Sequence, residues 1–206
     1  MVYCLLPSKK ADGKIVGPGG PQAGGVWRSA DRGETWESAM GDGIRLQAGG
    51  NMDQFQFLAM AQTSPDTVYV TDRANNRVQA FTLDGKFLKE GFIKRDSKGT
   101  GTAFRVAFSA DPEQRFVYIA DGSNERIAIL ERASLEEIGH IGGPGRKAGE
   151  FFHRHSLDVD PQGNIVTGES QGYRVQKFIF KGLTARGRSK IIRGQTPLAP
   201  IFDQEP

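Results

Sequence analysis

The chain has a single cysteine, Cys4, among its 206 residues. One cysteine excludes an intrachain disulfide and a zinc cluster built from cysteine thiolates. Histidine is almost as scarce, with three residues. The sequence also has no run of about 18 uninterrupted apolar residues, the length that a membrane-spanning helix needs. We therefore expect a fold without disulfides and without a membrane span.

The first ten residues lack the charged start, long apolar stretch and small-residue cleavage site of a secretory signal. Residues 2–6 instead predict a β-strand. Because a strand needs neighbours along its edges, this start favours a chain that is the later part of a longer ancestral product. The compartment stays open, and an extracytoplasmic location would follow if the chain is a fragment of an exported protein.

An excess of one charge sign is also missing from most of the chain. The segment after residue 180 holds five of the 27 basic side chains and two of the 24 acidic ones, which leaves 22 of each kind in residues 1–180. With 37% hydrophobic residues, 27 glycines and 10 prolines, the composition is typical of a globular, turn-rich protein. The neutral body disfavours nucleic acid as a partner, because phosphate neutralisation dominates such binding.

One pattern occurs three times in the chain. It appears as VYVTDRANNRV from Val68, as VYIADGSNERI from Val117 and, more loosely, as IVTGESQGYRV from Ile165. Each copy has an apolar strand, an acid, a short polar turn and then an arginine followed by a β-branched residue. A period near 50 residues that is built from strands and turns is typical of a β-propeller.

The acids of the three copies are 49 and 48 residues apart, and the arginines have the same two spacings. An acid at the end of a strand can accept hydrogen bonds from the amides of the following turn, and an arginine five residues later can bridge it. We therefore expect a structural role within each blade for these residues: Asp72, Arg77, Asp121, Arg126, Glu169 and Arg174.

Residues 29–36, SADRGETW, match the pattern S-x-D-x-G-x-T-W at every fixed position. This segment resembles the Asp-box of sialidase-type (BNR) propellers, in which the motif lies at a turn remote from the catalytic centre. Asp31 and the hydroxyls can bond to turn amides, and Trp36 can anchor the hairpin by burial. The motif thus indicates a further blade and is no evidence for glycosidase activity.

Runs of alternating or continuous apolar residues, separated by turn residues, predict the strands of the three repeats. We predict an all-β fold, a β-propeller of four-stranded antiparallel blades with about four blades present as an incomplete or partial propeller. The domains are an Asp-box-containing partial blade over 1–50, propeller blades over 51–183 and a basic, proline-bearing tail over 184–206. The predicted strands are 55–61, 68–71, 78–82, 87–92, 106–109, 116–120, 127–131, 135–141, 156–160, 165–167 and 175–180.

Residues 54–183 resemble NHL-repeat proteins, particularly the bacterial six-bladed propellers. The resemblance lies in VYVTDRANNRVQAF, FVYIADGSNERIAIL, GGPGRKAGEFFHRHSLDVDPQGNIV and YRVQKFIFKGL. Six blades would need more chain than is present here. Either the circle is incomplete, or a second copy supplies the missing wall by self-association, or the blades close more tightly, since propellers have roughly four to eight blades.

The segment FFHRHSL, residues 151–157, is similar to part of the peptidyl-hydroxyglycine lyase that completes peptide amidation, a zinc enzyme of this group. The resemblance implies that His155 is a zinc ligand and that Arg73, which follows Asp72, is a catalytic arginine. His153 lies two residues from His155 on a predicted extended segment, so both could face one way and hold a metal. Catalytic zinc normally has three protein ligands, so we expect no cofactor and keep zinc as the alternative.

Loop residues that differ between the blades are the candidates for ligand contact, because loops on a rigid scaffold carry function. These residues are Arg73, Ser123, Asn124 and Tyr173. The favoured function is a non-catalytic scaffold that recognises a peptide, glycan or protein partner through the inter-strand loops and the channel mouth. The alternative is a metal-dependent lyase or hydrolase related to the amidating enzyme. RNA binding, known for some NHL domains, is disfavoured by the neutral body.

Overall fold

The computed structural model of the chain describes residues 2–6, 10–11, 14–17, 20–21, 25–29, 31, 34–35, 37–38, 55–60, 67–185 and 198–204. Every regular element in these ranges is a β-strand. The same residues contain no helix with the length and hydropathy that crossing a membrane requires. The predicted all-β class is confirmed.

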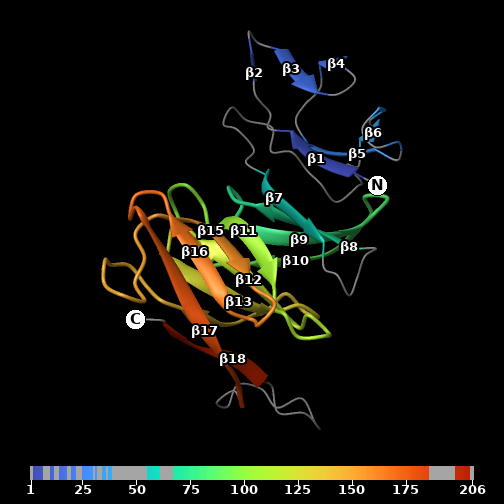
Figure 1. Cartoon of the computed structure of the whole chain (residues 1–206). Coiled ribbons are helices and arrows are strands. Elements are labelled where there is room, and N and C mark those ends of the chain that lie inside the picture. The colour runs from blue at the N-terminus through green and yellow to red at the C-terminus, as the bar shows by residue number, and fades with distance from the viewer. Residues whose placement is uncertain are drawn as a thin grey trace.

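Two small sheets form the N-terminal part (Figure 1). The predicted strand at the start of the chain is confirmed as β1, and its partner β5 includes the extended segment before the Asp-box pattern. In the turn that follows, the carboxylate of Asp31 accepts hydrogen bonds from the backbone amide of Thr35, at 2.9 Å, and from the Thr35 hydroxyl. Trp36 lies outside the described residues. The strands are β1 (Val2–Leu6), β5 (Gly25–Ser29) and β6 (Glu37–Ser38) in one sheet, and β2 (Lys10–Ala11), β3 (Lys14–Gly17) and β4 (Gly20–Pro21) in the other.

Three four-stranded antiparallel sheets follow, each with its strands paired in chain order. The second blade contains β7 (Phe55–Met60), β8 (Thr67–Asp72), β9 (Arg77–Thr82) and β10 (Phe87–Phe92). The third contains β11 (Ala103–Phe108), β12 (Phe116–Asp121), β13 (Arg126–Glu131) and β14 (Glu137–Ile141). The fourth contains β15 (Arg154–Val159), β16 (Ile165–Glu169), β17 (Arg174–Ala185) and β18 (Leu198–Gln204).

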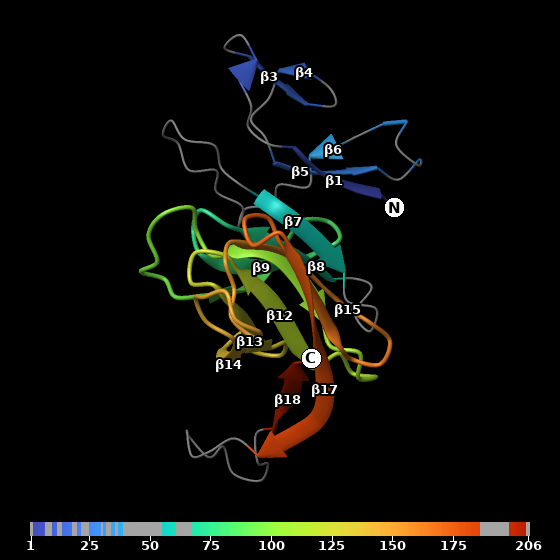
Figure 2. The same ribbon diagram turned by 60° about the vertical axis from the view of Figure 1, so that its left-hand side comes forward.

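The fourth blade differs from the sequence prediction at its outer edge. The C-terminal segment 184–206 was expected to be a tail, but residues 198–204 form β18, which pairs with β17 from Phe178–Gln204 to Ala185–Leu198. Pro200 is tolerated in β18 because an edge strand has one side without a partner strand, and the missing amide hydrogen of a proline can face that side. Figure 2 shows β18 lying along β17.

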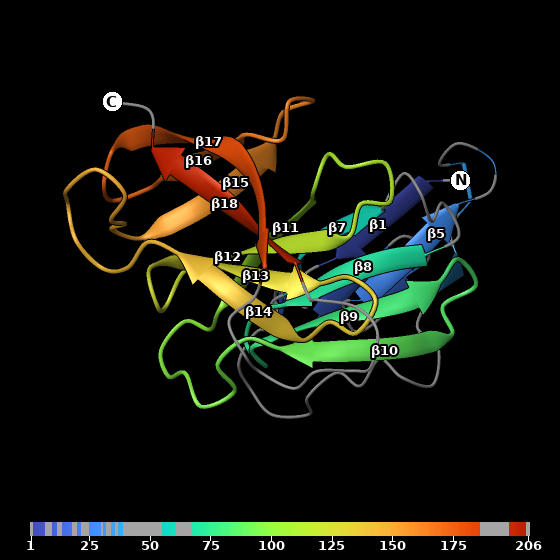
Figure 3. The same cartoon turned by 90° about the horizontal axis from the view of Figure 1, so that it is seen from below.

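The first strands of consecutive sheets contact one another, β1 with β7, β7 with β11 and β11 with β15. Figure 3 shows β11 between β15 and β7, with β10 and β14 farther out. Sheets whose first strands meet while their fourth strands lie at the rim are arranged as the blades of a propeller. The described blades form part of such a fan.

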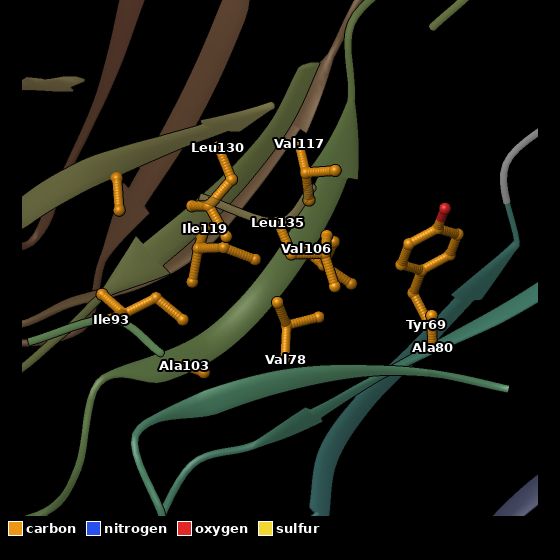
Figure 4. Packing of buried hydrophobic residues seen from close by; sticks show 11 residues of the cluster. Tyr69, Val78, Ala80, Ile93, Ala103, Val106, Val117, Ile119, Leu130 and Leu135 are labelled. Carbon is orange, nitrogen blue, oxygen red and sulfur yellow. The ribbon is translucent and has the colours of Figure 1, made fainter. Parts of the chain in front are cut away.

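Apolar side chains fill the space between successive blades. Tyr69 and Val78 of the second blade pack with Val117 and Leu130 of the third, all of them almost fully buried (Figure 4). The far side of the third blade packs in the same way against the fourth, through residues that include Tyr118 and Phe178. Burial between blades therefore supplies most of the hydrophobic contact.

The outer face of the fourth blade is open. Val78, Ile127 and Val175 each follow the repeat arginine of their blade. The first two are 0% exposed because the next blade covers them, whereas Val175 is 72% exposed. The fourth blade thus presents the surface on which another blade would pack.

Close packing between the second and third blades leads to a first prediction. A Cβ atom added at Gly91 would lie 2.3 Å from the carbonyl oxygen of Leu135 and 2.6 Å from its Cβ. We expect Gly91→Ala to lower the free energy of unfolding by about 1–3 kcal/mol, the usual cost of overpacking. Urea denaturation would measure the change.

Gly139→Ala is the matched control, since Gly139 also lies in a fourth strand and an added Cβ there meets no atom within 4 Å. The control should change stability by no more than about 0.5 kcal/mol. Equal unfolding midpoints for the two variants would contradict the packing between these blades.

Candidate functional site

The turn between the second and third strands is built alike in all three blades. The repeat acid ends the second strand, and the repeat arginine begins the third, directly opposite it in the ladder. In each blade the arginine Nε donates to the carboxylate, at 2.8, 2.8 and 2.6 Å. We call each such pair a clamp. The three clamps are Asp72–Arg77, Asp121–Arg126 and Glu169–Arg174.

The clamp arginines differ in their second partner. Arg77 reaches Glu90 of β10 at 2.9 Å, and Arg126 binds both carboxylate oxygens of Glu137 of β14 at 2.6 and 2.9 Å. Arg174 instead donates to the carbonyl oxygens of Arg146 and Glu150, both at 2.6 Å. The clamp of the fourth blade therefore holds the connection between the third and fourth blades.

Two of the predicted ligand-contact residues are used inside the fold. The Ser123 hydroxyl donates to the carbonyl oxygen of Gly101 at 2.5 Å. The Asn124 amide donates to the Ser97 hydroxyl at 2.8 Å and to the carboxylate of Asp121 at 2.8 and 3.1 Å. Both residues join the third blade to the connection that precedes it, which makes them less available to a ligand.

Arg73 and the two histidines, which come from different blades, lie around one aromatic ring. The Arg73 guanidinium carbon is 3.8 Å from the ring centroid of Phe104, a cation–π distance. The imidazoles of His155 and His153 approach the same ring edge to face, with centroids 5.4 and 6.2 Å away. We call Arg73, Phe104, His153 and His155 the mouth site, since they gather where β11 and β15 begin.

Irregularities in the first strands accompany this gathering. The ladder shifts register between Phe55 and Phe57, between Ala103 and Val106, and between Arg154 and Ser156, next to the residue opposite each clamp acid. Such β-bulges bend a strand and redirect a side chain, and they are frequent next to binding sites. Phe104 and His155 lie within two of these bulges.

Two glycines allow Phe104 and Arg73 to take their positions. A Cβ at Gly122 would lie 2.4 Å from the Phe104 ring. Gly101 has φ +85°, and a Cβ there would lie 1.9 Å from the Arg73 carbonyl oxygen. Arg73 is further fixed by a hydrogen bond of 2.5 Å from its Nε to the Thr100 carbonyl.

The charges at the mouth site favour a neutral His155. Burial lowers the pKa of its imidazole, and the positive charge of Arg73 and the neighbouring His153 lower it further. Burial also lowers the pKa of Arg73, which remains a cation because its ordinary pKa is far above neutrality. The site thus offers one fixed positive charge beside an uncharged imidazole.

Tyr173 extends the site along the open face of the fourth blade. It is 90% exposed and has φ 51°, an unusual backbone conformation for an aromatic residue. A shallow hollow of about 480 Å³ runs from His155 past Ser156 to Tyr173 and Val175. The hollow thus leads from His155 of the mouth site to Tyr173.

A metal centre at the predicted histidines would need more ligands than these two. No group of three or more His, Cys, Asp or Glu residues that could hold a metal ion occurs among the described residues. The third histidine, His140, lies on β14 and is exposed. Zinc binding at His153 and His155 stays a prediction.

The blades and their fan-like arrangement define an all-β, partial β-propeller. No protein-family model matches the chain, and no curated protein matches it. Among solved structures it is similar to hydrazine synthase of Kuenenia stuttgartiensis, with 11% identity and a TM-score of 0.50 over 66% of this chain and 36% of that one. A second similar structure is dihydro-heme d1 dehydrogenase NirN in complex with DHE, with 17% identity and a TM-score of 0.44 over 70% of this chain and 28% of that one. The chain thus spans little more than a third of the first of these proteins and less than a third of the second, and the likeness to hydrazine synthase concerns the fold alone.

The electrostatic contact at the mouth site leads to a second prediction. Replacing Arg73 with glutamine removes a positive charge that lowers the pKa of His155. We therefore expect Arg73→Gln to raise that pKa, as followed by NMR titration of the imidazole. The pKa of His155 is lower in the folded protein than in the unfolded chain, so the free energy of unfolding increases as pH rises from the folded to the unfolded pKa. In Arg73→Gln the two pKa values should be closer, so this increase should span a narrower pH range.

Arg95→Gln is the matched control, because Arg95 also lies over an aromatic ring, Phe92, at 3.6 Å. The His155 titration curve should be the same in the control and the unmodified protein. An unchanged curve in Arg73→Gln would show that Arg73 and His155 do not interact.

Proposed function

We propose that this protein is a non-catalytic propeller module that binds a peptide or protein segment through a carboxylate at the mouth site. The supporting observation is Arg73, held over Phe104 beside His155. Within the described residues its Nη groups have no hydrogen-bond partner, and a guanidinium presents such donors in a geometry that matches a carboxylate.

The surroundings of Arg73 add to its suitability for an anionic group. Its guanidinium is partly withdrawn from water, which strengthens a charged hydrogen bond. Phe104 and the exposed Tyr173 offer aromatic surface to the rest of a bound segment, and aromatic side chains contribute much contact area at small entropic cost. A peptide with a carboxylate satisfies these requirements better than a neutral glycan, which would not need the partly buried cation.

The finer family assignment is also part of the proposal. We assign the second to fourth blades to the NHL type, with support from the equivalent acid–arginine clamps in all three. The N-terminal hairpin is assigned as an Asp-box repeat, with support from the two hydrogen bonds between Asp31 and Thr35.

A metal-dependent lyase or hydrolase is the second candidate. One observation favours it, since Arg73 and His155 come from different blades and still meet at Phe104. His155 and His153 would be the protein ligands, and zinc would act as a Lewis acid on the substrate oxygen. The binding role is preferred because two histidines leave the usual set of three protein ligands incomplete.

Self-association is the partner arrangement that the open fourth blade favours. The residue at the position of Val78 and Ile127 is Val175, which is 72% exposed where the other two are fully covered. We propose a second copy as the occupant, because it would continue the blade-to-blade interface that already repeats within the chain. Such burial of apolar surface is the main favourable term in most protein association.

Binding to the mouth site is tested with minimal probes, N-acetylglycine for the carboxylate and N-acetylglycinamide as its neutral analogue. Only the carboxylate should shift the His155 resonances and raise the imidazole pKa. A charge-assisted hydrogen bond is worth about 1.5–3 kcal/mol, so Arg73→Gln should weaken binding at least roughly tenfold. Binding should tighten as pH falls through the His155 pKa.

Arg95→Gln again serves as the control and should bind N-acetylglycine as the unmodified protein does. Equal shifts with the amide, or undiminished binding by Arg73→Gln, would refute the carboxylate site.

Native mass spectrometry of protein purified with added zinc tests the other two points on one sample. We expect a dimer without stoichiometric zinc, and a monomer for Val175→Glu. Leu88→Glu is the control, since Leu88 is an exposed apolar residue of the rim strand β10 and should leave the dimer intact. A monomeric unmodified protein would exclude self-association, and zinc that His155→Ala removes would favour the lyase.

A further inference from the structure

A second cavity lies at the opposite end of the blades from the mouth site. Its volume is about 310 Å³, and it is enclosed by the turns that join first to second strands in the third and fourth blades, with residues of β17. Turns of that kind lie at the other end of a meander from the clamps. The cavity is therefore separate from the proposed carboxylate site.

The walls of this cavity are mostly apolar. Phe116 and Tyr118 of β12 form one side and are 4% and 1% exposed, and Phe180 and Leu183 of β17 form the other. A Cβ atom added at Gly182 would meet no atom within 4 Å, so the backbone leaves open space there. Cavities of about 300 Å³ or more with apolar walls are typical of sites for small molecules.

The third and fourth blades pack differently from the second and third. Between the second and third blades, Tyr69 packs edge to face on Phe108, with ring centroids 5.0 Å apart. Tyr118 occupies the position of Tyr69 in the next blade, but Val159 stands where Phe108 would be. Tyr118 instead packs edge to face on Phe202 of β18, with ring centroids 5.8 Å apart, and its side chain also lines the cavity.

A tyrosine hydroxyl also lines the cavity. It belongs to Tyr118 and makes no hydrogen bond to the described residues. Burial, together with the charge of Asp111, raises its pKa, so the hydroxyl stays protonated and can donate or accept. The hydroxyl can therefore form a hydrogen bond with a polar group of a ligand that enters the cavity.

Asp111 sets the charge that the ligand can carry. Burial opposes its ionisation, but hydrogen bonds from the Ser109 hydroxyl and the Arg115 amide outweigh this and lower its pKa. The carboxylate at the cavity is therefore anionic at neutral pH. An anionic ligand would be repelled, and a ligand with a hydroxyl donor would be favoured.

We propose that the cavity between the third and fourth blades binds a small, flat aromatic alcohol whose hydroxyl pairs with Tyr118. Its volume is about twice that of a 150 Å³ cavity known to hold one benzene ring, which corresponds to a ligand of two fused rings. The aromatic faces of the ligand would lie against the rings of Phe116 and Phe180, which line the cavity.

Three probes of equal shape test the proposal, namely 2-naphthol, naphthalene and 2-naphthoate, with binding followed by fluorescence. We expect 2-naphthol to bind saturably, about fivefold more tightly than naphthalene because of one net hydrogen bond, and 2-naphthoate to bind more weakly than either. Tyr118→Phe should reduce 2-naphthol binding to the level of naphthalene and leave naphthalene unchanged.

Leu183→Trp should fill the cavity, which Leu183 lines, and abolish binding of all three probes. Ala110→Leu, at the exposed rim of the cavity, is a second filling variant in case the first one disturbs the fold. Arg73→Gln, at the mouth site, should not affect 2-naphthol. Absence of saturable binding, binding that both filling variants retain, or loss of binding in Arg73→Gln would overturn the proposal.

Discussion

The acid–arginine clamp is the interaction on which the rest of this structure depends. In the third blade the side chain of Asp121 is 0% exposed and that of Arg126 is 7% exposed. A charge buried in this way is tolerable only with its partner in place, since removal of one member of a buried pair costs about 3–5 kcal/mol. Each blade is therefore committed to the same tight turn between its second and third strands. The connections between blades are then bound to that end, as Asn124 is to Ser97.

Variation at one position of the repeat turns this regular end into an asymmetric site. The residue after the clamp acid is Arg73 in the second blade, Gly122 in the third and Ser170 in the fourth. Arg73 covers the Phe104 ring, whereas Gly122 leaves room for the same ring. Ser170 donates to the backbone carbonyl of His153 at 3.1 Å. All three copies of this position thus lie at the mouth site, and only Arg73 is charged.

Local sequence signals were sufficient for most of the fold but for little of the site. Alternating apolar residues and turn residues located β12 and β13 to within one residue, because each strand pairs with its neighbour in sequence. The strand β18 was missed, since its pairing with β17 crosses a long connection and its proline resembles a loop signal. Phe104 was also missed, because a phenylalanine in an apolar run is indistinguishable from a core residue until distant Arg73 is placed over it.

The clamp of the fourth blade, Glu169–Arg174, links the stability of that blade to the geometry of the mouth site. In the second and third blades the arginine continues to a glutamate of the fourth strand, so its role ends within the blade. In the fourth blade Arg174 holds the connection that leads to His153, and the Glu169 carboxylate accepts a hydrogen bond of 2.8 Å from the amide of Phe152. His153 follows at φ 54°, a conformation that a non-glycine residue keeps only when its surroundings enforce it. The same ion pair that closes the blade therefore sets where the histidines meet Phe104, and an element of the propeller repeat becomes part of the proposed binding site.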